Sequence, residues 1–282
     1  MQRNRYTNAP TLLPTLLLVL LGPSGMKAQE EETGWKDVAE LTFVLTSGNA
    51  TSSTLGFKNT ADYTWPNAAF QLSAGGVRTR SGTVTRTATG SPSNFTVSET
   101  TDTKTTAESY FLKGRLDRNL SEALFAFGGA GWDRNTFAGV NNRYAFVGGA
   151  GRAWFAEDTR RLKTDLGLTY TIQDDVVKNP EVDDSFLGIR ASYDYLRKLT
   201  DNTEFTSVLV ADQNLNETSD LRTDWTNSLA VAMSDRLALK TSYQLLYDKT
   251  PALVAVPLGD GEVLVPLGKV DGVFTVAIVA SF

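Results

Sequence analysis

The chain has 282 residues, with 27 Lys or Arg, 32 Asp or Glu, no His and no Cys, which gives a formal net charge of −5. Without His, a Ser-His-Asp triad, a Cys-His pair and a His-ligated zinc site are impossible, so we expect no metal or other cofactor. The acidic balance also argues against a nucleic-acid partner, because proteins that bind nucleic acids are normally basic.

The first 28 residues have the pattern of a cleaved secretory signal peptide. Arg3 and Arg5 precede an apolar run at 12–21, which small residues follow. Cleavage would remove Arg3, Arg5 and Lys27 but no acidic residue, so 24 basic and 32 acidic residues would remain, with a net charge of −8. No later run approaches the ~20 apolar residues of a transmembrane helix. An exported chain without Cys must also fold without disulfides.

The rest of the chain alternates between apolar and polar residues with the period of a half-buried strand. In 53–65, for example, Leu55 and Phe57 belong to the apolar row, and Lys58 and Asp62 belong to the polar row. No segment has a convincing helical period. The twelve alternating segments have the approximate ranges 35–47, 53–65, 68–80, 105–117, 123–134, 142–155, 161–173, 185–196, 203–213, 220–233, 236–248 and 269–282.

These segments predict an all-β fold, a transmembrane antiparallel up-and-down β-barrel of about twelve strands over residues 35–282, after a short periplasmic segment at 29–34. Short turns such as 66–67 alternate with longer loops such as 81–104 and 249–268. Outer-membrane barrels have short periplasmic turns and longer extracellular loops, so we expect both termini on the periplasmic side. A soluble barrel with its apolar row inward would leave a lumen of this width hollow. We therefore expect the chain in the outer membrane of a Gram-negative bacterium.

Aromatic residues and the last residue support this placement. Trp and Tyr prefer the membrane–water interface, and on the apolar rows they occur near short turns, as at Trp154 and Tyr195, and near long loops, as at Trp132 and Tyr247. The last alternating segment ends in Phe282. A terminal Phe on such a strand resembles the sorting signal of outer-membrane barrels. We therefore assign Phe282 as the assembly signal and expect the barrel-assembly machinery as a partner.

The polar rows line the lumen if the apolar rows face lipid. Basic and acidic residues are intermixed along these rows, as in Lys163 and Asp165. A strongly selective channel would show a ring of one sign, whereas mixed signs fit a salt-bridge network that plugs the lumen or narrows it to a small pore. The candidate lumen-lining charges are Lys58, Asp62, Lys113, Arg115, Asp117, Asp133, Arg143, Lys163, Asp165, Arg190, Asp194, Arg222, Asp224, Lys240 and Asp248, with Glu40, Glu204 and Asp212 as further acidic candidates.

Polar residues also interrupt the rows that should face lipid. Arg152 lies near the periplasmic rim, where a long side chain can extend to water at a cost of only about 0–1 kcal/mol. The amides Asn59 and Asn227 are harder to place in lipid. They indicate either a protein contact inside the membrane or an error in the assigned register. The other exceptions are Thr164, Ser207, Thr223 and Thr241.

Glycine motifs and two long loops complete the pattern. Gly-Gly-Ala-Gly occurs at 128–131 and 148–151, and because no helix start follows, sharp strand curvature is a better interpretation than a phosphate cradle. The loop 81–104 is rich in Ser and Thr, so we expect it to be mobile and exposed. Apolar residues flank Gly259-Asp260-Gly261, which predicts a β-hairpin within 249–268.

Short motifs link the chain to a known family. The first segment ends in Ser47-Gly48-Asn49-Ala50, and Trp132-Asp133-Arg134 is followed by Phe137-Ala138-Gly139-Val140 and Arg143. Over about 35–282 the chain resembles the domain-of-unknown-function family 481, whose members are labelled salt-induced outer membrane protein. The resemblance implies an outer-membrane barrel with no established catalytic activity. Asp133, Arg134 and Arg143 would form either a clamp for lipopolysaccharide phosphates or an ion, or a salt bridge that pins a loop to the rim; we favour the salt bridge.

Three functions remain open. The first is passage of ions or small solutes through a narrow pore, which the family label links to osmotic or envelope stress. The second is a closed structural or adhesion barrel whose extracellular loops bind partners. The third is a histidine-free enzyme, but no nucleophile and activator pair stands out, so we expect the chain not to be an enzyme. Outer-membrane lipid and lipopolysaccharide are the expected surroundings, and the oligomeric state is left open.

Overall fold

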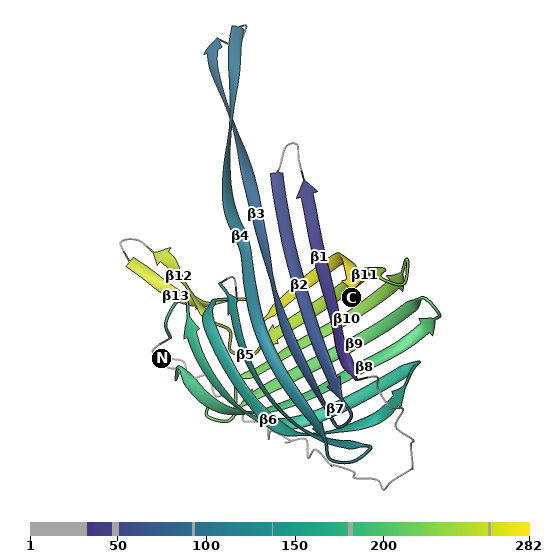
Figure 1. Cartoon of the computed structure of the whole chain (residues 1–282). Coiled ribbons are helices and arrows are strands. Elements are labelled where there is room, and N and C mark those ends of the chain that lie inside the picture. The colour runs from purple at the N-terminus through teal and green to yellow at the C-terminus, as the bar shows by residue number, and fades with distance from the viewer. Residues whose placement is uncertain (1–32, 47–50, 92–93, 137, 180–182, 259–260) are drawn as a thin grey trace, which may run out of the picture.

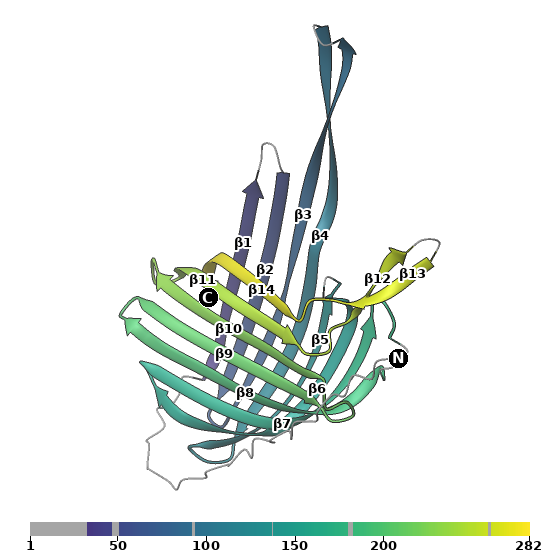
Figure 2. The ribbon, with the colours of Figure 1, turned by 180° about the vertical axis from the view of Figure 1, so that it is seen from behind.

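The computed structural model describes residues 33–46, 51–91, 94–136, 138–179, 183–258 and 261–282. Twelve antiparallel strands form one closed barrel, in which β14 pairs with β11 on one side and β1 on the other, and β12 and β13 form a separate two-stranded sheet (Figures 1 and 2). No described segment is a helix long and apolar enough to cross a membrane. The strands are β1 (Gly34–Thr46), β2 (Thr51–Trp65), β3 (Ala68–Ser91), β4 (Asn94–Asn119), β5 (Leu124–Asn135), β6 (Val140–Glu157), β7 (Arg160–Asp175), β8 (Ser185–Thr200), β9 (Thr203–Asn214), β10 (Leu221–Ala232), β11 (Leu237–Asp248), β12 (Leu253–Leu258), β13 (Gly261–Pro266) and β14 (Val270–Ser281).

The predicted fold class is confirmed, because twelve barrel strands form where the alternation places them. The short turns after β2, β4, β6, β8 and β10 share one end of the barrel with its first and last residues. The backbone of Phe282 donates to Asp37 O at 2.9 Å and accepts from Asp37 N at 3.2 Å, so the last residue lies beside the start of β1. The signal peptide at 1–28, most of the segment 29–34 and the motif at 47–50 lie outside the described residues.

The apolar rows face outward and the polar rows face the lumen. Leu168 is 66 % exposed, whereas the next residue, Thr169, is 3 % exposed. A water-soluble protein rarely exposes an apolar surface of this extent, but the wall of a membrane barrel does. Pairing between neighbouring strands also satisfies the backbone groups that hydrocarbon cannot hydrogen-bond, except along part of the junction between β1 and β14. The chain is therefore a transmembrane barrel of the outer-membrane type, and the outer membrane is its location.

The segment 81–104 differs from its prediction as a loop. It continues β3 and β4 as a hairpin in which Gly82 pairs with Thr103 and Ser91 pairs with Asn94, after a register shift at Thr79 and Arg80. Threonine is β-branched and favours strands, so the polarity of this segment reflects exposure on both faces and not a lack of secondary structure. The hairpin rises well beyond the rest of the barrel (Figure 1).

The predicted hairpin within 249–268 is present. β12 pairs with β13 from Leu253 and Pro266 at its base to Leu258 and Gly261 at its tip. Below the base, Leu267 N donates to Ala252 O at 2.9 Å, which closes the hairpin. The hairpin lies beside the barrel mouth and not across it (Figures 1 and 2).

The two Gly-Gly-Ala-Gly motifs allow close approach of neighbouring strands. A Cβ added to Gly149, on the lumen face, would contact Leu166 O and lie 2.5 Å from Gly167 Cα. At Gly148, on the lipid face, the nearest atom would be 3.9 Å away. The neighbouring backbone therefore leaves no room for a side chain at Gly149 but does leave room at Gly148. A glycine needed on the lumen side only fits a wall that curves toward the lumen.

The seam between β1 and β14 is short. These strands pair only at 38–41 with 278–281, whereas β14 pairs with β11 along nearly its whole length. Within the described residues, 42–46 of β1 and 270–277 of β14 have no pairing across the seam. Closure of the barrel therefore depends on few backbone hydrogen bonds and on side chains that bridge the seam.

Candidate functional site

The register places all fifteen candidate charges on the rows that face the lumen. Pairs of opposite sign often stand directly across from each other on neighbouring strands, as Arg190 and Asp212 do between β8 and β9. Most of these charges belong to three groups. We name them the Arg115 group, in the periplasmic half, the seam group, at the junction of β1 and β14, and the mouth group, at the extracellular end.

The Arg115 group fills one side of the lumen between β4 and β8. Arg115 Nε donates to Asp117 Oδ1 at 2.7 Å, and its Nη2 lies 2.9 Å from Asp165 Oδ2. Its guanidinium carbon lies 4.1 Å from the centre of the Phe127 ring, and both Phe127 and Phe125 are buried. A guanidinium over a ring gains electrostatic attraction from the ring face. The members are Arg115, Asp117, Asp165, Ser192, Phe125 and Phe127.

The seam group joins strands on the two sides of the closure. Lys240 Nζ on β11 donates to Glu40 Oε1 on β1 at 2.8 Å, which spans β14. Lys58 Nζ on β2 lies 3.9 Å from the same oxygen. Lys58 also interacts electrostatically with Lys113 and Asp224. The seam group, Glu40, Lys58, Lys113, Lys240 and Asp224, thus holds three cations against two anions.

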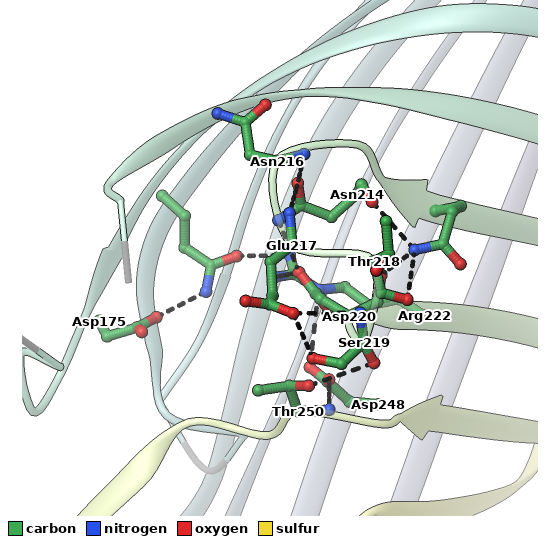
Figure 3. A network of polar contacts seen from close by, with 12 residues as sticks. Asp175, Asn214, Asn216, Glu217, Thr218, Ser219, Asp220, Arg222, Asp248 and Thr250 are labelled. Atoms are coloured by element: carbon green, nitrogen blue, oxygen red, sulfur yellow. Dashed lines mark hydrogen bonds and ion pairs between the residues drawn. The ribbon is translucent and has the colours of Figure 1, made fainter. Parts of the chain in front are cut away.

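The mouth group is organised around Arg222 (Figure 3). Its Nε and Nη2 donate to the two carboxylate oxygens of Asp220 at 3.0 and 2.7 Å, and its Nη1 donates to Gln173 Oε1 at 2.7 Å. Gln173 Nε2 in turn donates to Asp175 Oδ1 at 2.7 Å, and Asp248 Oδ2 lies 3.7 Å from Arg222 Nε. One guanidinium therefore ties β7, β10 and β11 together at the extracellular end.

The loop 215–220 extends this network. The buried Asn214 side chain donates to Asp220 Oδ2 at 3.1 Å and accepts from the backbone of Asn216 at 2.8 Å. Glu217 Oε1 accepts from Ser219 Oγ at 2.6 Å and from Ser219 N at 3.2 Å, and these hydrogen bonds lower the pKa of Glu217. The loop is thus held by its own polar groups and anchored to Arg222 (Figure 3).

Two further arginines complete the mouth group, each paired with one aspartate. Arg190 Nε and Nη2 donate to the two oxygens of Asp212 at 2.7 and 2.8 Å. Arg143 Nε donates to Asp133 Oδ1 at 3.1 Å, and its Nη2 lies 2.9 Å from Oδ2. Such two-point contacts fix the orientation of both partners. Asp133 and Arg143 thus form a salt bridge between two directly paired residues of β5 and β6.

Three other acidic candidates are held by weaker or neutral partners. Asp62 accepts from Gln71 Nε2 at 2.8 Å, and Asp224 accepts from Gln244 Nε2 at 2.8 Å. Asp194 lies 3.6 Å from Arg161 Nη2. These carboxylates keep more freedom than those of the mouth group, because each lacks a two-point guanidinium contact.

Among the four candidate lysines of the lumen, Lys113 and Lys163 have no carboxylate of a described residue within ion-pair distance, whereas Lys58 and Lys240 do. Lys163 stands across from Asp194 in the β7–β8 register, and Lys113 Nζ lies 5.5 Å from the centre of the Phe111 ring. Over the same ranges, no three His, Cys, Asp or Glu side chains are grouped to hold a metal ion. The lumen therefore presents paired charges at the mouth and less compensated cations deeper inside.

The family described as "Protein of unknown function, DUF481" matches residues 39–254. The chain belongs to this family. No curated protein matches the chain.

Solved structures with similar folds include a translocator domain, a porin and an outer membrane channel. The translocator domain of autotransporter NalP from Neisseria meningitidis is 14 % identical, with a TM-score of 0.45, over 89 % of this chain and 89 % of that chain. The NanC porin is 11 % identical, with a TM-score of 0.46, over 88 % and 98 %. The COG4313 outer membrane channel from Pseudomonas putida F1 is 11 % identical, with a TM-score of 0.44, over 93 % and 100 %.

Several residues of the site could not be singled out from the sequence. Asp220 is the first residue of the predicted segment 220–233 and was not among the candidate charges; only its contact with Arg222 gives it a role. Phe125 and Phe127 are apolar residues on a lumen-facing row. The alternation predicts their strand but gives no reason for two aromatic rings in the lumen. Glycines on the neighbouring strands were the sequence signal for these rings, because Phe125 packs beside Gly151 on β6 and Phe127 packs beside Gly167 on β7.

Proposed function

We propose that the barrel is a narrow, water-filled passage for ions or small solutes across the outer membrane. The observation that carries this proposal is the exposure of Lys58. Its side chain is 43 % exposed although it lies near the middle of β2 and faces the lumen. Burying a charged group without full pairing is costly, so a dry, packed lumen would not leave an ammonium group in this state. Water in the lumen supports passage of solutes that fit beside the lining side chains.

The charges support weak selectivity only. The seam group has three cations and two anions, while at the mouth three arginines face more than three aspartates. The charges of the described residues form no complete ring of one sign around the lumen, and such a ring is what strong selection between anions and cations uses. We therefore expect solute size to limit passage more than charge does, with a modest anion preference set by Lys58 and Lys113.

Single-channel recording from the refolded full chain in planar bilayers tests this function. We expect reproducible small conductance steps and a modest anion preference. Replacing Lys58 and Lys113 together with Glu should shift the reversal potential in a salt gradient toward cation preference. The matched control is Arg118→Glu, at the periplasmic rim of the outer wall, which should leave the reversal potential unchanged. Absence of steps across salt and voltage would exclude the proposed passage.

The long β3–β4 hairpin favours a second candidate, adhesion to an outside partner. It exposes paired strands beyond the barrel (Figure 1), and exposed strand edges can pair with other chains. Replacing 81–104 with a tight turn should leave conductance intact and abolish binding to host or bacterial surfaces if the hairpin is adhesive. Equal surface binding with and without the hairpin would exclude it as the binding element. A link to osmotic or envelope stress stays a prediction that rests on the family label.

A further inference from the structure

A groove of about 580 Å³ lies on the outer wall, over β7 to β10. The rings of Tyr193, Tyr195, Phe205 and Trp225 line it together with Leu162. Polar residues that interrupt the lipid-facing rows gather in the same place, because Thr164, Ser207 and Asn227 also line the groove. These residues do lie on the rows that face away from the lumen. The polar residues on the lipid-facing rows are therefore not the result of an error in the assigned register.

Two of the three polar side chains are hydrogen-bonded within the wall. Ser207 accepts from Trp225 Nε1 at 3.1 Å and shares a 3.0 Å hydrogen bond with the Tyr193 hydroxyl. Thr164 Oγ1 accepts from Trp154 Nε1 at 2.8 Å. Asn227 differs, because its amide has no hydrogen bond to any residue that the structure describes. An amide facing hydrocarbon without a partner is costly. Whatever fills the groove therefore has to offer Asn227 a polar group.

The periplasmic end of the groove is cationic. Arg160 and Arg197 stand directly opposite each other in the β7–β8 register, on the rows that carry Leu162 and Tyr195 into the groove. Arg160 binds Glu157 at 2.8 and 2.9 Å, whereas Arg197 is exposed and has no carboxylate partner among the described residues. Like charges directly across a sheet are unfavourable. An anion between the two guanidinium groups would relieve this repulsion.

We propose that this groove binds one anionic glycerophospholipid of the periplasmic leaflet. Its phosphate would lie between Arg197 and Arg160, and one acyl chain would lie along the aromatic rings. Its ester carbonyls are hydrogen-bond acceptors close to the acyl chains and suit the amide of Asn227. Arginine pairs bind phosphate well because several donors point the same way, and basic pockets at membrane surfaces select anionic headgroups.

Two other occupants fit less well. Lipopolysaccharide lies in the outer leaflet, whereas this groove opens near Leu162 and Phe205, each two residues from the periplasmic start of its strand. A second copy of the chain, related by a two-fold axis, would place the same surface on both sides of the contact. Because both copies would span the membrane in the same direction, the arginines of both would lie at the same depth along one contact, and their repulsion would oppose it.

Native mass spectrometry of the full chain, incubated with equal amounts of phosphatidylglycerol and phosphatidylcholine, tests the proposal. We expect phosphatidylglycerol to be retained in preference. Arg197→Gln should lower this preference about fivefold, the factor expected for one Arg near an anionic surface. Arg118→Gln, on the same rim but on β4, is the matched control and should leave the preference unchanged. Asn227→Trp should fill the groove and reduce retention of both lipids.

Equal effects of the two arginine variants, or no preference in the wild type, would overturn the proposal. So would a dimer that forms without lipid and dissociates in the Asn227→Trp variant, because the occupant would then be a second copy. Fluorescence provides a readout that needs no arginine variant. Brominated phosphatidylglycerol should quench the wild-type protein more than brominated phosphatidylcholine does. This difference should shrink in Trp225→Phe and disappear when Trp154, which hydrogen-bonds to the groove residue Thr164, is also replaced with Phe. If the difference is unchanged in the variant that lacks both Trp154 and Trp225, the lipid does not occupy this groove.

Discussion

Arg115 on β4 and Asp165 on β7 are in contact, with 2.9 Å between Nη2 and Oδ2, although β5 and β6 lie between their strands. Neighbouring strands are about 4.7–4.9 Å apart, so a flat wall would separate the two backbones by about 14 Å. Across from Arg115 stands Gly129, and across from Asp165 stands Gly151. The wall curves toward the lumen here, and its side-chain-free positions leave room for the guanidinium to reach across two strands.

The buried end of this contact gives a first prediction. Asp165→Asn keeps the shape but removes the charge that Arg115 and Ser192 contact, and the Asp165 side chain is only 7 % exposed. Hydrogen bonds to charged groups contribute about 1.5–3 kcal/mol, so we expect a loss of this order in the free energy of unfolding. Urea unfolding of the refolded barrel in lipid vesicles, followed by Trp fluorescence, measures it.

The control for this measurement is Asp62→Asn, because Asp62 accepts a hydrogen bond from the neutral Gln71 and forms no ion pair with any residue that the structure describes. Its free energy of unfolding should change by no more than about 0.5 kcal/mol. If both variants lose the same free energy of unfolding, the charge of Asp165 in the Arg115 group does not stabilise the barrel.

The glycine motifs give a second prediction. Gly149→Ala should destabilise the barrel by about 1–3 kcal/mol, because the new Cβ would contact the Leu166 carbonyl and force the strands apart. Gly148→Ala, one residue earlier, has space for a methyl group and should be neutral or slightly stabilising. The same urea titration compares them. A neutral Gly149→Ala variant would show that close strand approach is not the reason for the motif.

Much of the fold follows from the period of the sequence. A side chain in a strand can face only lipid or lumen, so the alternation around Leu168 fixes both its strand and its face. The strands within 81–104 could not be predicted in this way, because a hairpin exposed on both faces has no apolar row. The pairings between side chains in the lumen could not be predicted either. Lys240 and Glu40 lie 200 residues apart, and only closure of the barrel brings them together.

That closure gives a third prediction. Because β1 and β14 share few backbone pairs, the hydrogen bond from Lys240 to Glu40 should contribute to holding the seam. A double-mutant cycle with Lys240→Met and Glu40→Gln isolates this interaction, and contacting residues show coupling of about 0.5–3 kcal/mol. We expect a value above 1 kcal/mol, roughly the upper limit for exposed pairs. The free energies come from urea unfolding of the two single variants and the double variant.

The matched pair for this cycle is Arg160 and Glu157, which form an equally short contact at the exposed rim. Solvent and salt screen an exposed pair, so the coupling should be smaller there than at the seam. Equal coupling in the two cycles would mean that the seam bridge has no special role in closure.

The lipid-facing assignment gives a fourth prediction. Leu168 lies in the middle of β7 with its side chain outward, so Leu168→Arg would place a charge at the centre of the hydrocarbon. The expected loss in the free energy of unfolding is about 2–4 kcal/mol. Leu237 also faces outward, but it is the first residue of β11, at the periplasmic rim. Leu237→Arg can extend to water and should cost only about 0–1 kcal/mol.

Urea unfolding in vesicles distinguishes these two variants if both fold. Folding is checked independently on unheated gels, because unfolded barrels migrate more slowly than folded ones. A large loss for Leu168→Arg with a small loss for Leu237→Arg is the pattern of a spanning wall, because the cost follows depth and not residue type. Similar small losses at both positions would mean that Leu168 contacts water. In that case the outward face could not be the lipid face, and the groove over β7 to β10 would open to solvent instead of to the membrane.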